Sequence, residues 1–97
     1  MKLLTKAILK TLPPLYSQDS KGEDAIARVK FFNPMGAGTW YASEFDPVEG
    51  LFFGVAIIQE REFGCFSLAE LAEVRLPFGL KIERDLYFKP RPLGECN

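Results

Sequence analysis

Apolar residues recur along the chain at two spacings, one typical of helices and one typical of strands. Near the N-terminus, Leu4, Ile8 and Leu12 recur every four residues, while lysines fall on another face. This spacing predicts a short amphipathic helix, because residues four apart share one face of a helix. Pro13 and Pro14 end the predicted helix, since proline cannot continue it.

A period of two follows between residues 27 and 33 and predicts the first strand. Residues 33–38 are rich in turn-forming types. A second strand is expected over 39–45, so that the two strands form a hairpin with a long tip. The inward side chains of the first strand are expected to be Ala27, Val29 and Phe31.

A third strand is predicted over 51–58, after a turn at 46–50 in which Asp, Pro and Gly occupy turn positions. Its residues are apolar on both alternating faces. Such a strand is either covered on both sides within the chain or covered on one side by a partner. If one face lacks cover, we expect a symmetric homodimer through that face, since large exposed apolar patches are rare on monomers.

The best-marked boundary in the sequence is the start of a second helix. A short fourth strand over 63–66 leads into Ser67, and Glu70 follows three residues later. This pair forms a capping box, which predicts a helix near 67–74. Its inward stripe is expected to comprise Leu68, Leu71 and Ala72.

In this order the elements predict a single α+β domain over 1–97. The domain is expected to contain a mostly antiparallel sheet of four to five strands, packed against the N-terminal helix and the helix near 67–74. A last strand is expected over 82–88. The polar segment 17–24 is predicted to be an exposed connection, and the proline-punctuated segment 90–97 a flexible tail.

Composition places the chain among globular proteins that fold without disulfides or metals. The 97 residues are 47% hydrophobic and include nine Phe, so burial can offset the loss of chain entropy. Two cysteines suit a reducing compartment, with Cys65 expected to be buried and Cys96 exposed. No apolar run is long enough to span a bilayer, and the basic N-terminus lacks a cleavage site. We therefore expect a cytoplasmic protein that does not bind membranes.

The formal net charge of -1 conceals a segregation of charge along the chain. Residues 1–30 carry +3, residues 31–74 carry −6 and residues 75–97 carry +2. An acidic middle segment can imitate the phosphates of nucleic acid, but pairing of basic ends with an acidic middle explains the pattern more simply. Because the chain has no basic excess, nucleic-acid binding is disfavoured.

We predict no catalytic residues. The chain has no His, which removes the commonest general base and every Ser-His or Cys-His pair. Glu44, Asp46 and Glu49 form a candidate acidic patch, a minimal oxygen-ligand site for Mg²⁺. Asp46 already initiates a turn, however, and a solvated strand end accounts for Glu44. We therefore predict no metal and no cofactor, and keep a divalent-metal-dependent enzyme as the last alternative.

The aromatic residues admit two interpretations. Exposed together, they would form a stacking platform for single-stranded nucleic acid, which also needs neighbouring cations. Arg28 and Lys30 are the cations nearby in the sequence, so core packing is favoured. The aromatic residues concerned are Phe31, Phe32, Trp40, Tyr41, Phe52 and Phe53.

A partner-binding site is predicted at the hairpin tip, 33–41. The tip combines a Gly-rich loop with Met35, Trp40 and Tyr41. Protein interfaces are enriched in Trp and Tyr, and Met adapts to uneven surfaces. Because Trp40 and Tyr41 alternate along a strand, one of them is expected to point inward and the other to contact the partner.

Several sequence motifs, taken together, point to a known family. They run from Phe31 to Tyr41, continue over 44–47 and 50–54, and recur at 66–71 and 83–88. These motifs resemble the family of domain of unknown function 2958, which comprises small bacterial proteins often carried by plasmids and other mobile elements. The similarity covers nearly the whole chain.

The resemblance supplies no catalytic residue and no ligand, and it implies a class of function by association alone. Small non-enzymatic proteins of mobile elements often bind a host factor. We therefore expect a binding protein of a mobile genetic element that acts on a host protein, such as a nucleic-acid-handling defence complex. The alternative is a nucleic-acid-binding accessory module.

Overall fold

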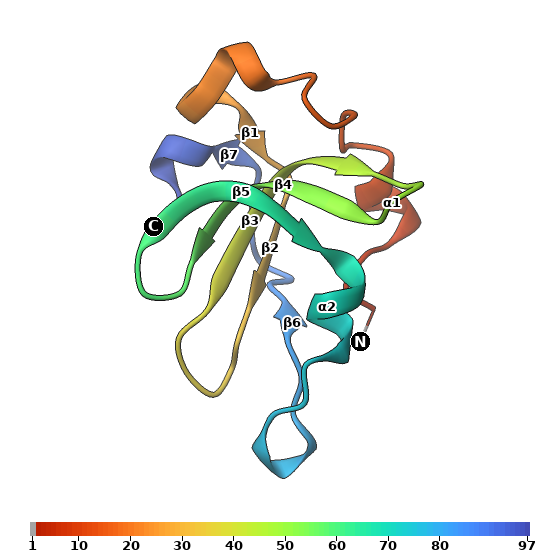
Figure 1. Ribbon diagram of the computed structural model, residues 1–97, viewed down its shortest axis with the longest axis vertical. Coiled ribbons are helices and arrows are strands. Elements are labelled where there is room, and N and C mark those ends of the chain that lie inside the picture. The colour runs from red at the N-terminus through yellow and green to blue at the C-terminus, as the bar shows by residue number, and fades with distance from the viewer. Residues whose placement is uncertain (1) are drawn as a thin grey trace.

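A computed structural model describes residues 2–97 and shows a five-stranded antiparallel sheet with the order β5-β4-β3-β2-β6 (Figure 1). A second, two-stranded sheet pairs β1 with β7. The predicted α+β class is confirmed. The strands are β1 Ile26–Ala27, β2 Val29–Phe32, β3 Thr39–Asp46, β4 Leu51–Ile57, β5 Arg61–Ser67, β6 Glu83–Arg84 and β7 Arg91–Pro92. The helices are α1 Lys6–Leu9 and α2 Leu68–Glu73, with short 3₁₀ turns η1 Asp19–Asp24, η2 Pro77–Gly79 and η3 Leu93–Glu95.

One face of the large sheet carries the main aromatic core. The ring of Phe52 lies 4.6 Å from that of Phe45 and 5.3 Å from that of Phe31, measured between centroids. Leu71 of α2 and Ile82 cover this cluster. The N-terminal segment packs against it through Leu3, Leu4, Ile8 and Leu12, which confirms the predicted apolar face although α1 itself is only four residues long.

The C-terminal segment covers the opposite face of the sheet. Leu93 and Cys96 are buried against Tyr41 and Val55. The Tyr41 hydroxyl donates a hydrogen bond to the carbonyl of Asn97 at 3.2 Å. Residues 90–97 therefore form a covering layer, in contrast to the flexible tail expected from their prolines, because η3 turns two apolar side chains onto the sheet.

Both faces of β4 are covered within the chain. Phe52 belongs to the aromatic core and Val55 to the cluster under the C-terminal segment. Of the two arrangements that the sequence allows, the structure thus has the first. The strand also approaches β3 closely at Gly54, where an added Cβ would lie 1.9 Å from the Tyr41 carbonyl oxygen.

Three predicted elements differ from the structure. β5 runs from Arg61 to Ser67 and is longer than the expected 63–66. The expected strand over 82–88 shrinks to β6, because the chain turns where the Asp85 carboxylate accepts a hydrogen bond from the backbone N–H of Tyr87 at 2.9 Å. The expected strand over 27–33 is divided at Arg28 between β1 and β2.

The start of α2 is confirmed in detail. The Ser67 hydroxyl accepts a hydrogen bond from the backbone N–H of Glu70 at 3.2 Å. Leu71 is buried and Leu68 packs against the core, but Ala72 is exposed and was wrongly placed in the inward stripe. The helix ends at Glu73, so Ala72 lies at the border of a surface groove rather than in the core.

The two cysteines have the reverse of their expected environments: Cys65 is exposed and Cys96 is buried. Cys65 lies on the outermost strand, where a small apolar residue is not covered, whereas Cys96 follows η3 into the core.

The segment 17–24 lies on the surface, with only Gln18 half-buried. Among residues 2–97, no helix has the length and apolar character needed to cross a membrane.

Candidate functional site

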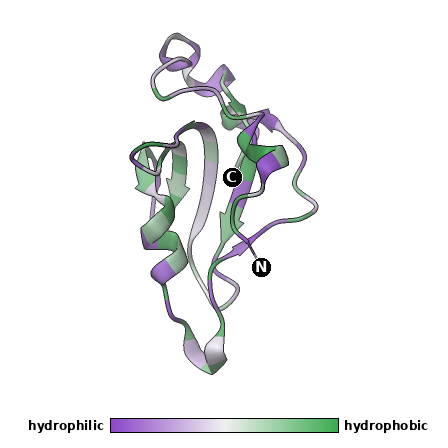
Figure 2. Ribbon diagram, turned by 90° about the vertical axis from the view of Figure 1, so that its right-hand side faces the viewer, coloured by the Kyte–Doolittle hydropathy of each residue, from purple (hydrophilic) through white to green (hydrophobic). Residues whose placement is uncertain are grey.

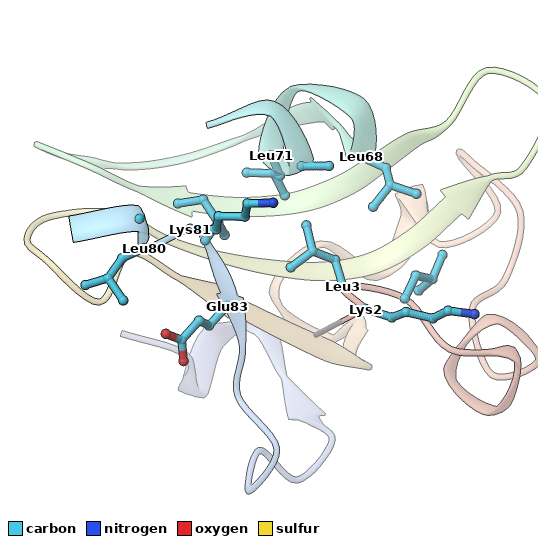
Figure 3. A pocket seen from close by; sticks show the side chains of 11 residues that line it. Lys2, Leu3, Leu68, Leu71, Leu80, Lys81 and Glu83 are labelled. Atoms are coloured by element: carbon cyan, nitrogen blue, oxygen red, sulfur yellow. The ribbon is translucent and has the colours of Figure 1, made fainter. Parts of the chain in front are cut away.

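An apolar groove of about 710 Å³ lies on the described surface. It lies between α2, the N-terminal segment 2–4 and the segment 79–83 that leads into β6. Figure 3 shows Leu68 and Leu71 reaching from α2 toward Leu3, which comes from the opposite wall. We call this hollow the α2 groove. Its lining residues are Lys2, Leu3, Leu4, Leu68, Leu71, Ala72, Gly79, Leu80, Lys81, Ile82 and Glu83.

Charged groups stand at the borders of the α2 groove. Lys2 and Lys81 supply two ammonium groups, and Glu83 supplies one carboxylate. Lys2 and Glu83 extend away at opposite ends of the groove in Figure 3. The groove therefore offers an apolar floor with a net positive border, which suits an apolar ligand that also carries a negative charge.

An exposed aromatic residue stands beside the α2 groove. Phe78 is 92% exposed and directly precedes Gly79, a lining residue. Its φ of 63° lies in the left-handed region, which is uncommon for a bulky residue. Figures 1 and 2 both show the loop that carries η2 projecting from the lower end of the molecule, beyond α2. Phe78 is thus presented to solvent by a conformation that costs free energy, a feature that clusters at functional sites.

The predicted site at the hairpin tip is not brought together by the structure. Met35 is 44% exposed, but Tyr41 is 1% exposed and belongs to the cluster under the C-terminal segment. Trp40 is half-buried and packs against the aromatic core on the other face. Tyr41 is therefore a core residue and cannot contact a partner, while Met35 and part of Trp40 remain accessible.

Hydrogen bonds close the hairpin tip on itself. The Asn33 side chain accepts from the backbone N–H of Met35 at 2.8 Å, and the Asn33 backbone N–H donates to the Gly38 carbonyl, also at 2.8 Å. Gly38 has a φ of 132°, and an added Cβ there would lie 3.0 Å from the Trp40 ring. These contacts give the tip residues a structural role in reversing the chain.

The three residues of the candidate acidic patch have separate roles. Glu44 is 1% exposed, and its two carboxylate oxygens accept hydrogen bonds from the backbone N–H groups of Tyr16 at 2.8 Å and Gln18 at 2.7 Å. Asp46 accepts from the backbone N–H of Val48 at 2.9 Å, as its predicted turn role requires. Glu49 is exposed. Glu44 is buried because a β-bulge after Ala42 shifts the register of β3.

A family model matches residues 3–94 and carries the description "Protein of unknown function (DUF2958)". The chain belongs to this family. The match spans nearly all of the DUF2958 protein, including α2, the groove residues from Leu3 onward and Leu93 of the C-terminal layer. Neither a curated protein nor a solved structure matches the chain.

In this DUF2958 protein the acidic residues do not assemble into a metal centre. No group of three or more Cys, Asp or Glu side chains within residues 2–97 is arranged to hold a metal ion. Glu44, the central member of the candidate set, already satisfies both of its oxygens with backbone donors. The set Glu44, Asp46 and Glu49 therefore does not assemble into a shared cation site.

The aromatic residues of the DUF2958 protein pack mainly inward. Phe31, Tyr41 and Phe52 are buried, which confirms core packing over a stacking platform for these residues.

Two ion pairs also differ from the expected pairing of the basic ends with the acidic middle segment. Lys30 pairs with Asp85 at 3.5 Å, and Arg61 pairs with Glu23 at 3.0 Å, so neither pair uses an acid of the 31–74 segment.

Proposed function

We propose that this DUF2958 protein is a non-enzymatic binding protein that holds a segment of a partner protein in the α2 groove. The observation that carries the proposal is the leucine-lined hollow of about 710 Å³ beneath α2. Concave, largely apolar hollows with a few polar groups are the usual form of binding sites. The groove belongs to the sheet face that supports α2, so its walls are held by the aromatic core.

The chemistry of the groove favours an amphipathic partner segment. Apolar side chains of the partner would replace water over Leu3, Leu71 and Leu80. Acidic groups flanking those side chains would meet Lys2 and Lys81, and Glu83 would disfavour acid at its own end. A helix or loop with two or three apolar anchors and adjacent carboxylates has this pattern.

The polar groups outside the groove support binding rather than catalysis. Glu44 holds the Tyr16–Gln18 backbone. The Ser43 hydroxyl donates to the carbonyl of Phe53 at 3.2 Å. Burial raises the pKa of the Cys96 thiol, which opposes its ionisation and hence its nucleophilicity. Each of these buried groups thus has a structural role.

The kind of partner is taken from the resemblance described under the sequence. The resemblance to proteins of plasmids and mobile elements supports a host protein as the occupant, for example a component of a nucleic-acid-handling defence complex. This part of the proposal rests on association with the family. The groove chemistry adds the requirement that the partner present an acidic amphipathic segment.

Occlusion of the groove tests this proposal. Ala72→Phe places a large ring at the border of the groove, at a residue that is exposed and outside the core. Ala69→Phe is the matched control, since Ala69 is also exposed on α2 but does not line the groove. Affinity capture of partner from host lysate should fall at least about tenfold with Ala72→Phe and stay unchanged with Ala69→Phe. Equal capture by both variants and the parent protein would exclude the groove as the binding site.

A further inference from the structure

The strand β5 forms an open edge of the large sheet. It is the outermost strand beside β4 and contains seven residues. The other edge, β6, has two residues, and the side chain of one of them, Arg84, donates to the carbonyl of Lys2. A long unpaired edge is a template for another strand, and proteins usually shorten, cover or charge such edges. In this protein β6 is short, whereas β5 is long and unpaired on its outer side.

Two hydrogen bonds establish which backbone groups of β5 point outward. The backbone N–H of Leu68 donates to the carbonyl of Gly50, so the backbone of Gly50 faces β5. The hydroxyl of Ser43, a residue of β3, donates to the carbonyl of Phe53, so the backbone of Phe53 faces β3. Because hydrogen bonding alternates along an antiparallel ladder, the residue paired with Phe53 directs its backbone away from β4. That residue is Cys65, and Phe63 shares its orientation. Within residues 2–97, no strand pairs with this side of β5.

Apolar side chains accompany the open backbone groups. Phe63 is 44% exposed and stacks on Phe53 with ring centroids 6.2 Å apart. Cys65 is exposed on the same face of the sheet, since the two residues lie two positions apart on a strand. Tyr16 is also largely exposed. The edge thus combines unpaired N–H and C=O groups with an adjoining apolar strip.

We propose that β5 pairs with β5 of a second copy of this chain, in antiparallel register about Gly64. In this register Phe63 lies opposite the partner's Cys65, and Cys65 lies opposite the partner's Phe63. Both members of each pair direct their backbone outward, so each pair exchanges two N–H···O=C hydrogen bonds. The two five-stranded sheets become one continuous sheet, and the contact is isologous, as a two-fold dimer requires.

The composition of the edge suits a second copy as the occupant. With Gly64 on the two-fold axis, the Glu62 residues of the two copies are separated by four residues along the strand, roughly 13 Å, so no like charges face each other. Gly64 has open space where a Cβ would be, which leaves the centre of the contact unobstructed. Each Phe63 ring would cover the partner's Cys65, and both exposed apolar strips would be buried together.

This contact is independent of the proposed function. The α2 groove is lined by the N-terminal segment, α2 and the segment 79–83, and it includes no residue of β5. The dimer would therefore carry two grooves. A partner that presents two copies of its binding segment would bind such a dimer with a higher overall affinity than it would bind a monomer.

Sedimentation of the 97-residue chain and of two separate variants at Cys65 tests the proposal. Cys65→Pro removes an outward N–H while leaving the ladder to β4 intact, and proline is tolerated on edge strands in this orientation. Cys65→Ser keeps the N–H and removes the thiol. The parent protein and Cys65→Ser should form dimers as concentration rises, whereas the dimer dissociation constant of Cys65→Pro should rise at least about tenfold.

Phe63→Lys is a second variant that preserves the β4 ladder and adds the charge with which natural edges avoid pairing. It should also sediment as a monomer while keeping the circular dichroism spectrum of the parent. A parent protein that stays monomeric at millimolar concentration would overturn the proposal. A dimer that persists in a folded Cys65→Pro or Phe63→Lys variant would overturn it as well, because the contact would then lie on another surface.

Discussion

The carboxylate of Glu44 accepts a hydrogen bond at 2.8 Å from the backbone N–H of Tyr16, 28 residues earlier in the chain. Its second oxygen accepts from Gln18 at 2.7 Å. Tyr16 has a φ of 68°, so the chain turns sharply where it meets the sheet. One buried side chain of β3 thereby fastens the connection between α1 and β1, since each buried backbone donor needs a partner.

Glu44→Gln should therefore destabilise the protein although it preserves the shape of the side chain. The amide of glutamine keeps one acceptor oxygen, but its NH2 group is a donor and would face one of the two backbone N–H groups. One charge-assisted hydrogen bond is therefore lost, and that backbone donor is left unpaired. We expect a loss of about 2 to 3 kcal/mol in the free energy of unfolding, measured by urea denaturation. The exposed residue Glu49 provides the control, and Glu49→Gln should change stability by less than about 0.5 kcal/mol. Equal effects of the two changes would contradict the role assigned to Glu44.

Gly54 and Gly64 are directly paired across β4 and β5, yet they should respond in opposite ways to alanine. A Cβ at Gly54 would lie 1.9 Å from the Tyr41 carbonyl, so β3 and β4 would have to separate. At Gly64 an added Cβ would meet no atom within 4 Å beyond its chain neighbours, and alanine lowers the entropy of the unfolded chain. Gly54→Ala should cost at least about 3 kcal/mol, within the range of severe core changes. Thermal unfolding of Gly64→Ala should show a stability equal to or slightly above that of the parent, and a tolerant Gly54→Ala would refute the close approach.

The C-terminal layer should contribute strongly to stability. Leu93 is fully buried over Tyr41, and Leu93→Ala should cost about 2 to 5 kcal/mol in a chemical denaturation experiment. Leu86, an exposed leucine in the neighbouring segment, serves as the comparison, and Leu86→Ala should be nearly neutral. If residues 90–97 behaved as a free tail, both variants would match the parent.

The two cysteines should react with thiol reagents at very different rates. Cys65 is exposed, whereas Cys96 is buried and burial raises the pKa of its thiol, against a smaller opposing effect of Arg91. Because the thiolate is the reactive form, Cys96 should react only when the protein unfolds. With native protein at low concentration, one thiol should titrate rapidly with a disulfide reagent, and the second only after addition of denaturant. Cys65→Ser should abolish the rapid phase, and a rapid phase that persists in this variant would contradict the burial of Cys96.

The sequence predicted local features well because their causes are local. The alternation over 39–45, the apolar run over 51–58 and the cap at Ser67 all reappear in the structure, as β3, β4 and the start of α2. Each of these depends on residues that are neighbours in the chain, such as the hydroxyl of Ser67 and the N–H of Glu70.

Features that join distant segments were not predictable in the same way. The α2 groove needs segments 2–4, 68–72 and 79–83 together, and no spacing within any one of them indicates a hollow. Glu44 was placed on the surface because a β-bulge, which shifts its register, leaves no mark in the alternation of apolar residues. The environments of Cys65 and Cys96 were exchanged for a similar reason, since they depend on strand order and on where η3 docks.

The most direct test of the proposed function is an NMR titration of the isotope-labelled protein with the acidic amphipathic segment of its captured partner. Binding in the α2 groove predicts that the largest amide shift changes fall on residues 2–4, 68–72 and 79–83, and that they vanish in Ala72→Phe. Shift changes confined to the hairpin tip at 33–41, or to the face covered by Leu93 and Cys96, would contradict the account.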